Sequence, residues 1–228
     1  MGKLQFGPAL ARGWQIFTKD PLNLILGGLI AFIISLTLVL FPAMTAGYVY
    51  MVKRIAKGEK AELGDVFHGF NDFARYLVGG LIFLLAMLPA YLLGLATSGL
   101  GVIASAVVMG LLLPFWPLMV DKKLSGPEAF KEGLEFYKRE YLTATIIALL
   151  FIALSFVAML TFGVANLITV PITIAIMVAA YEQSYGFSDD EDAVREGEFE
   201  EVAVEPEPER KPEQAATPAA DEEEKPEA

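Results

Sequence analysis

The sequence predicts an all-α, polytopic membrane helical bundle followed by an acidic C-terminal tail. First, 55% of the 228 residues are hydrophobic and the mean hydropathy is +0.51, whereas soluble domains are about 45–50% apolar. Second, three long windows of the chain contain no ionisable side chain. Third, most of the acidic residues follow the last of these windows, so the apolar body and the charged tail are separate segments.

The charge-free windows are residues 21–52, 76–120 and 141–181. A membrane-spanning helix needs about 20 apolar residues to cross the bilayer core. The second and third windows are long enough for two crossings each. Glycine-containing stretches at 96–101 and 161–166 provide the backbone freedom for a turn. These two windows therefore predict two helical hairpins.

The first window is harder to divide. One straight helix over its 32 residues would be about 48 Å long, which exceeds the hydrocarbon thickness. Two helices of about 15 residues would each be short for a crossing. Pro42 and Gly47 mark the expected break, which favours a short hairpin or a re-entrant pair. We therefore predict six transmembrane helices, with five as the alternative.

A short amphipathic segment precedes each window, and we call these the leading segments: 8–19, 64–75 and 128–139. Aligned without gaps, each has a glycine, an aromatic residue four positions later and a basic residue at its end. These are Gly13, Phe17 and Lys19; Gly69, Phe73 and Arg75; and Gly133, Tyr137 and Arg139. Apolar residues at i, i+4 and i+7 predict interfacial helices. We predict three pseudo-repeats of one interfacial helix and one hairpin; alternatively, any short amphipathic helix beside a span has these features.

The basic residues predict the orientation in the cell membrane. Lys and Arg flank the windows, whereas the two predicted hairpin turns contain neither. Cytoplasmic loops are enriched in Lys and Arg, so both segments between the windows should be cytoplasmic. The N-terminus, with three basic residues before the first window, and the C-terminal tail should then be cytoplasmic too. This arrangement requires the first window to cross an even number of times.

Several stretches also resemble an uncharacterised family of prokaryotic multi-pass integral membrane proteins. They include 114–123 (Pro-Phe-Trp-Pro-Leu-Met-Val-Asp-Lys-Lys), Glu128-Ala129-Phe130, and the hairpin that continues to Pro171 and Tyr181. Gly47-Tyr48, Lys57-Gly58-Glu59 and 65–70 belong to the same pattern. The resemblance covers roughly residues 5–187 and excludes the tail. It implies a membrane helical fold and no particular activity.

The residue inventory argues against catalysis. The chain has no cysteine and one histidine, His68, so cysteine-based metal sites are excluded and a triad would depend on that histidine. Asp65, His68 and Asp72 could share one helix face, but this spacing is common on solvated faces. No phosphate-binding or dinucleotide-binding motif occurs in a supporting context. We expect no enzyme activity, no cofactor, and no catalytic, cofactor-binding or metal-binding residues.

Prolines and small residues indicate how the helices could bend and pack. Breaks or kinks are expected at Pro42, Pro89, Pro114, Pro117 and Pro171, either at a substrate site or as ordinary membrane-helix prolines. The pairs Ala86/Ala90 and Ala106/Gly110 permit close helix contact, inside one chain or in a homo-oligomer.

The C-terminal domain, residues 188–228, contains 17 acidic and four basic residues, a net charge of −13. Domain 1–187 keeps 11 acidic and 13 basic residues, a net charge of +2. Such an acidic, proline-punctuated segment cannot bury enough apolar surface to fold, so we predict a disordered tail. It would dock a basic soluble protein or only increase solubility, and no nucleic-acid footprint is visible.

These observations predict a non-catalytic membrane scaffold or adaptor with a cytoplasmic acidic tail and the lipid bilayer as its surroundings. The absence of ionisable residues inside the windows weighs against an ion-coupled transporter. The alternative is a transporter or channel-like subunit for a neutral or lipid-like solute. A central cavity would favour transport, and tight packing would favour the scaffold.

Overall fold

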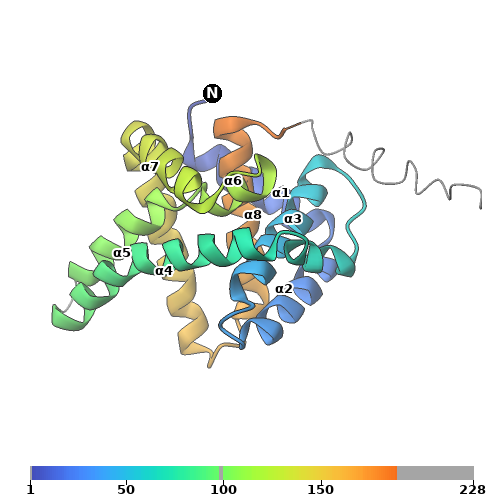
Figure 1. Cartoon of the computed structure of the whole chain (residues 1–228), viewed down its shortest axis with the longest axis horizontal. Coiled ribbons are helices and arrows are strands. Elements are labelled where there is room, and N and C mark those ends of the chain that lie inside the picture. The colour runs from blue at the N-terminus through green and yellow to red at the C-terminus, as the bar shows by residue number, and fades with distance from the viewer. Residues whose placement is uncertain (1, 98–99, 189–228) are drawn as a thin grey trace, which may run out of the picture. The chain divides into compact units, whose positions relative to one another are not determined.

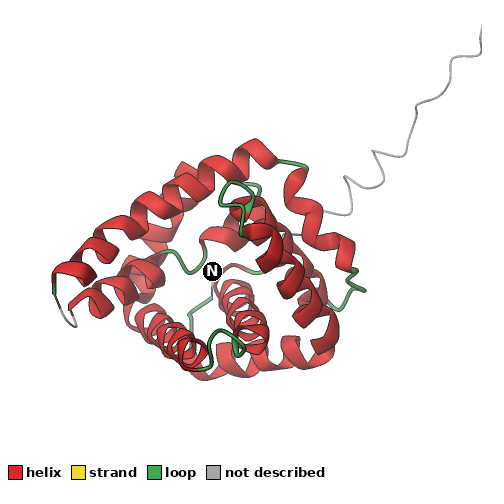
Figure 2. Cartoon of the chain, turned by 90° about the horizontal axis from the view of Figure 1, so that it is seen from below, coloured by secondary structure: helices red, strands yellow, loops and turns green. Residues whose placement is uncertain are grey.

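The computed structural model describes residues 2–97 and 100–188, and these ranges contain helices and loops but no strand (Figures 1 and 2). The helices, in chain order, are α1 (Phe6–Lys19), α2 (Pro21–Ser35), α3 (Phe41–Lys57), η1 (Leu63–Phe70), α4 (Phe73–Ala96), α5 (Leu100–Leu111), α6 (Phe115–Asp121), α7 (Gly126–Leu160) and α8 (Asn166–Tyr185). The predicted disordered tail lies outside the described residues except for Ser188, which belongs to the body.

Four helical stretches are long and apolar enough to cross a membrane: α4, Gly101–Asp121, α7 and α8. A fifth is α1 with α2, if this pair, bent by 92°, counts as one span. The structure therefore has four or five membrane-compatible stretches within the described ranges. The first predicted hairpin consists of α2 with 15 residues and α3 with 17, which are each short for a crossing.

The break in the first window lies slightly earlier than predicted. Helix α2 ends at Ser35, and Pro42 lies in the first turn of α3, where its missing N–H costs no helical hydrogen bond. Gly47, the second predicted marker, is inside α3, so this part of the prediction is wrong. A Cβ at Gly47 would overlap the carbonyl oxygen of Val66 in η1. Gly47 therefore serves a close backbone contact and not a turn.

The other two hairpin turns lie where the glycine-containing stretches predict them. Helix α4 ends at Ala96 and α5 begins at Leu100, with residues 98 and 99 outside the description. Residues 161–165 join α7 to α8, and Gly163 has a φ of +85° there. In Figures 1 and 2 the α4–α5 hairpin projects from the rest of the body.

Two of the three leading segments are α-helical, and the second is not. Residues 64–75 form the 3-10 helix η1 and the first residues of α4, so the predicted second interfacial α-helix is wrong. Two glycines lower the α-helical propensity of Leu63–Phe70. A capping box at Glu62 and Asp65 fixes its first turn. The third leading segment forms the first part of α7. A single non-helical residue, Glu140, with φ −121° and ψ 21°, separates it from the rest of that helix.

Three glycines lie where the helix contacts are most extensive, between α1 and α8, between η1 and α3, and between α7 and α5. They are the aligned glycines of the leading segments, Gly13, Gly69 and Gly133. A Cβ at any of them would lie less than 3.0 Å from backbone of the facing helix. The facing residues are Ile176, Ala43 and Leu111, respectively. Glycine is therefore needed at all three contacts because each brings two backbones together.

Small residues also pack inside the chain on α5. Ala106 is buried, and a Cβ at Gly110 would lie 3.1 Å from the Ala144 carbonyl carbon of α7. The Ala106/Gly110 pair thus serves an intramolecular contact.

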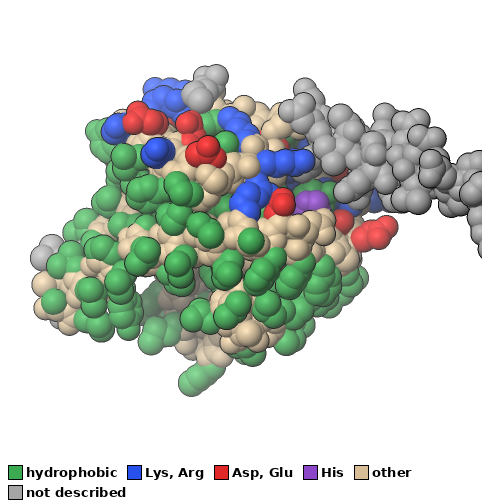
Figure 3. Space-filling model, in the orientation of Figure 1, with side chains coloured by type: hydrophobic (Ala, Val, Ile, Leu, Met, Phe, Trp, Pro, Cys, Tyr) green, Lys and Arg blue, Asp and Glu red, His purple; other side chains and the backbone are tan. Residues whose placement is uncertain are grey.

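The surface of the body separates charged from apolar side chains. In Figure 3 the Lys, Arg, Asp and Glu side chains of the body gather in the upper part of the view, and hydrophobic side chains cover the lower part. Helix α4 exposes Leu81, Leu85, Leu92 and Leu95 to more than half of their full extent. A soluble monomer rarely exposes so large an apolar surface, so the fold is compatible with a membrane.

Candidate functional site

A cavity of about 610 Å³ lies between the helices and is the candidate binding site. Its wall is built from α2, α3, α8 and parts of α4 to α7, and no Asp, Glu, Lys, Arg or His side chain contributes to it. Its polar side chains are Ser35, Thr45, Tyr48, Asn166 and Thr173. Binding pockets for small molecules commonly have volumes of about 300–1,000 Å³ and mostly apolar walls. The size and the lining therefore suit a ligand that is neutral and largely apolar.

Some polar groups of the wall already have partners in the protein. The Tyr48 hydroxyl donates a 2.8 Å hydrogen bond to the Leu24 carbonyl oxygen, and the Thr45 hydroxyl donates one of 2.8 Å to Phe41. Donors bound to backbone carbonyls offer little to a polar ligand. The chemistry of the wall is thus still more apolar than its residue types suggest.

Two turns mark the exposed end of the cavity. Leu36 follows α2 and Phe162 follows α7; both line the cavity and are 74% and 100% exposed. The α2–α3 and α7–α8 turns lie at the bottom of Figure 1, and the charged side chains lie in the upper part of Figure 3, drawn in the same orientation. The cavity therefore has apolar residues at the end that is remote from the charged face. Pro171 also lines the wall, whereas Pro89 does not.

A buried polar cluster lies at the other ends of the wall helices, and we call it the polar plug: Lys53, Asp121, Tyr181 and Ser188. The Lys53 ammonium is 2.7 Å from the Asp121 carboxylate, and these side chains are 2% and 1% exposed. The Tyr181 hydroxyl donates a 2.5 Å hydrogen bond to Asp121. The Ser188 amide and hydroxyl donate to the same carboxylate at 3.1 and 2.8 Å. One carboxylate thus joins α3, α6, α8 and Ser188, the last residue of the body.

The polar plug and the cavity share three helices. Tyr48 in α3 and Trp116 in α6 line the cavity, and five residues further on come Lys53 and Asp121. In α8, Tyr181 follows the wall residue Met177 by one turn. Five helical residues rise about 7.5 Å. The plug therefore lies directly beyond the cavity, toward the charged face.

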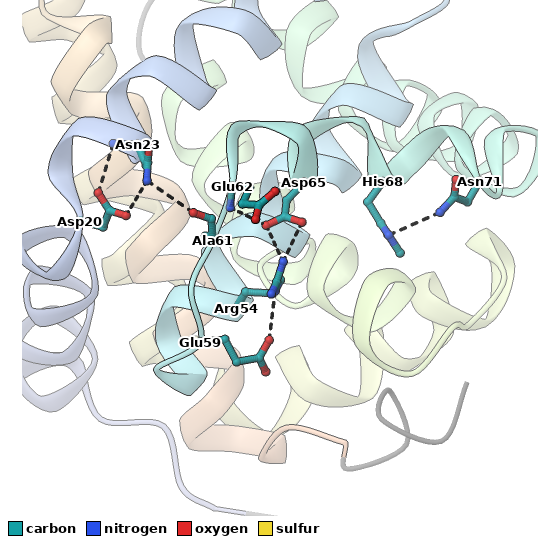
Figure 4. A network of polar contacts seen from close by, with 9 residues as sticks. All are labelled: Asp20, Asn23, Arg54, Glu59, Ala61, Glu62, Asp65, His68 and Asn71. Carbon is teal, nitrogen blue, oxygen red and sulfur yellow. Dashed lines mark hydrogen bonds and ion pairs between the residues drawn. The ribbon is translucent and has the colours of Figure 1, made fainter. Parts of the chain in front are cut away.

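A second polar network holds the loop between α3 and η1 against its neighbours (Figure 4). The Arg54 guanidinium donates to both carboxylate oxygens of Asp65 at 2.8 Å, and to Glu59 at 3.0 Å. Burial lowers the pKa of Arg54, but these hydrogen bonds outweigh it and raise the pKa above its ordinary value. The Asn23 amide bridges the Asp20 carboxylate and the Ala61 carbonyl oxygen. These contacts order the loop and form no reactive pair.

The Asp65, His68 and Asp72 side chains do not form a common site, because each has a different partner. His68 stacks on Tyr50, with ring centroids 3.7 Å apart. Asp65 binds Arg54, and Asp72 binds Arg75 at 2.7 Å. Within residues 2–97 and 100–188, no group of three or more His, Cys, Asp or Glu side chains could hold a metal ion.

Sequence reasoning missed the polar plug because Lys53 and Asp121 lie immediately beyond the ends of two charge-free windows. The glycines five residues after Lys53, Asp121 and Tyr181 do not provide a common signal. Gly58 and Gly186 follow the ends of α3 and α8, whereas Gly126 begins α7.

Comparison of the chain with family models, with curated proteins and with solved structures gave no match. The resemblance of residues 5–187 to a prokaryotic membrane family therefore stays a prediction.

Proposed function

We propose that the body is a non-catalytic transporter or channel-like subunit that binds a neutral, lipid-like solute between its helices. The observation that carries this proposal is the cavity of about 610 Å³ with a wall free of Asp, Glu, Lys, Arg and His side chains. A cavity of this size is unfavourable to a purely structural scaffold, which requires tightly packed helices. An apolar ligand would gain free energy from burial in it, and a charged one would lose its hydration without compensation.

The proposal includes six crossings in three units: α1 to α3, η1 to α6, and α7 with α8. Two sets of contacts support this division. Gly69 of the second unit packs on α3 of the first unit, and Gly133 of the third unit packs on α5 of the second. Gly13 of the first unit packs on α8 of the third. The closing basic residue of each leading segment reaches the end of the last helix in its own unit. Lys19 donates to the Ile55 and Ala56 carbonyls, Arg75 donates to the Met119 carbonyl, and Arg139 interacts with Tyr185.

The proposed orientation has the charged face in the cytoplasm. Cations at the C-terminal ends of helices are favourable because they oppose the helix dipole. The same residues satisfy the preference of Lys and Arg for the cytoplasmic side. In this orientation the polar plug and the start of the tail are cytoplasmic.

Tryptophan fluorescence tests solute binding. Trp116 lines the cavity, and the only other tryptophan, Trp14, is exposed, so Trp14→Phe leaves a single reporter in the wall. A brominated long-chain alcohol, which is neutral and quenches on contact, should quench Trp116 saturably in the purified protein. Thr173→Phe, which fills part of the cavity, should weaken this binding about tenfold.

The matched control is Thr143→Phe, the same substitution in α7 outside the cavity wall. It should leave the quenching curve unchanged. Quenching that does not saturate, or that is equally strong in both phenylalanine variants, would overturn the proposal because it would reflect partition into detergent alone.

A second candidate function is an adaptor that docks a basic soluble protein through its tail. The observation that favours it is the concentration of a net charge of −13 in residues 188–228, beside a body of +2. Cross-linked affinity purification from membranes should recover a soluble partner with the full chain and not with a chain ending at Phe187. Recovery of the same proteins with both chains would reject the adaptor role.

A further inference from the structure

We propose that Ser188 is a latch: while bound to Asp121 it keeps the polar plug closed at the charged end of the cavity, and its release opens that end. This inference rests on the proposed function, because it treats the cavity as a solute site. It adds a regulated opening toward the charged face, where the acidic tail begins.

The plug is well built to close this end. It contains one side chain from each of α3, α6 and α8, and all three are buried. The small space between this cluster and Phe187 has no volume for a water molecule. This space therefore has no room for water or solute beside Lys53 and Asp121 while the cluster is intact.

Closure depends on the Asp121 carboxylate having all of its donors. A buried charge is tolerated only when it is paired and hydrogen-bonded, and a lost donor leaves part of the desolvation cost uncompensated. Ser188 provides two of the donors to Asp121, and its hydroxyl also donates to the Asp121 carbonyl oxygen at 3.1 Å. Without Ser188 the carboxylate would be stabilised by water, and admitting water to the cluster opens the plug.

Ser188 is the movable member of the cluster. Lys53, Asp121 and Tyr181 are held in helices, whereas Ser188 follows the end of α8 on a strap of three residues, 186–188. The strap leaves α8 at Gly186, whose φ is +71°, and its Phe187 ring packs 6.3 Å from the Tyr181 ring. The strap is held by the Ser188 hydrogen bonds to Asp121 and by the packing of Phe187 on Tyr181, and neither Phe187 nor Ser188 lies in a helix.

The sequence next to the latch is strongly charged. The four residues that follow Ser188 are Asp189-Asp190-Glu191-Asp192. A basic partner that binds them would act within four residues of the latch along the chain, which gives the latch a means of regulation.

Thiol accessibility tests the latch, since the chain has no cysteine. Met177→Cys places one thiol in the cavity wall, one turn from Tyr181. In proteoliposomes selected for an outward charged face, a charged, membrane-impermeant maleimide should react slowly with it. Adding Ser188→Glu places a second carboxylate next to that of Asp121, and the two repel each other. This variant should accelerate the maleimide reaction about tenfold. Ser188→Thr, which keeps both donors, should not.

A second background makes the result specific. In Lys53→Met/Asp121→Leu the helix side chains of the plug are uncharged and there is no carboxylate for Ser188 to bind, so Ser188→Glu should no longer change the labelling rate. If Ser188→Glu does not fold, Ser188→Ala should give a smaller acceleration in the same direction. Equal labelling rates for native Ser188, Ser188→Ala and Ser188→Glu would overturn the latch, as would an equal acceleration in the Lys53→Met/Asp121→Leu background.

The latch and the solute site can fail separately. Saturable Trp116 quenching with labelling rates insensitive to Ser188 would reject the latch and retain the solute site. Labelling that depends on Ser188, with no saturable quenching, would retain the latch and reject the solute site.

Discussion

The Lys53 ammonium and the Asp121 carboxylate meet at 2.7 Å, with almost no exposure of either side chain. They come from the ends of α3 and α6, so one ion pair joins two of the three helices that continue from the cavity wall. Burying both charges costs hydration, and their attraction repays this cost only while both partners are present. The main effect of the pair is therefore to fix how the ends of α3 and α6 are arranged, and its net contribution to the free energy of unfolding is small.

Lys53→Met should lower the free energy of unfolding by about 3–5 kcal/mol, because it leaves the Asp121 charge buried without its ion-pair partner. Lys53→Met/Asp121→Leu should regain most of this loss, since no buried charge remains. Denaturant unfolding in detergent measures both values. Lys122→Met, on an exposed neighbour of Asp121, is the control; its ammonium lies 4.5 Å from the Tyr185 ring centroid, so it should cost no more than about 1 kcal/mol. A double variant no more stable than the single one would contradict this account of the pair.

Gly69→Ala should destabilise the protein by about 1–3 kcal/mol, because its methyl group would overlap the Ala43 carbonyl oxygen and force α3 and η1 apart. Gly64→Ala is the matched control in the same 3-10 helix, where nothing lies within 4 Å of an added Cβ. It should be neutral or slightly stabilising. Thermal unfolding of the two variants compares them directly, and equal losses would show that crowding at Gly69 is not the cause.

Arg12→Met should destabilise the contact between α1 and α8. The Arg12 Nε and Nη2 atoms donate to the two Glu182 carboxylate oxygens at 2.8 Å, and Nη2 also donates to the Ala56 carbonyl. Because the side chains are about one-third exposed, solvent screening limits the expected loss to about 1 kcal/mol. Lys138→Met removes a pair in which both side chains are 64% exposed and should cost nothing measurable. Unfolding at low and high salt should show a salt dependence for the Arg12 pair.

Cysteine labelling in the naturally cysteine-free chain tests whether the first hairpin crosses, which decides between six crossings and four. Val39 lies in the α2–α3 turn and Val164 in the α7–α8 turn, and both are exposed. With six crossings, cysteines at both positions should react from the same side of the membrane, opposite to a cysteine at Lys60. A cysteine at position 39 that reacts from the Lys60 side would mean that the first hairpin does not cross.

Helical hairpins could be predicted from the sequence because hydropathy and glycine-containing turns are local properties. The windows 76–120 and 141–181 gave both turns, at the end of α4 and after Leu160. The first window was less informative because its helices are short, and the structure leaves α2 and α3 below the length typical of a crossing.

Features that depend on contacts between distant residues could not be predicted in this way. Gly47 looked like a helix break, but it is a packing glycine that faces Val66 of η1. The helix that makes this contact with Gly47, η1, is a 3-10 helix, which the sequence pattern did not predict. The approach of Lys53 to Asp121 depends on the packing of α3 against α6, which no local pattern encodes.

The contact between α1 and α8 has a consequence for synthesis. The Gly2 amide donates to the Ser184 carbonyl oxygen at 3.0 Å, and Gly13 packs on Ile176, so the first helix docks on the last one. During synthesis α1 is made long before α8, so its most extensive contact cannot form until then, although Arg12 and Lys19 can already bind the Ala56 carbonyl oxygen of α3. Docking of α1 on α8 is therefore a late step in the assembly of the bundle.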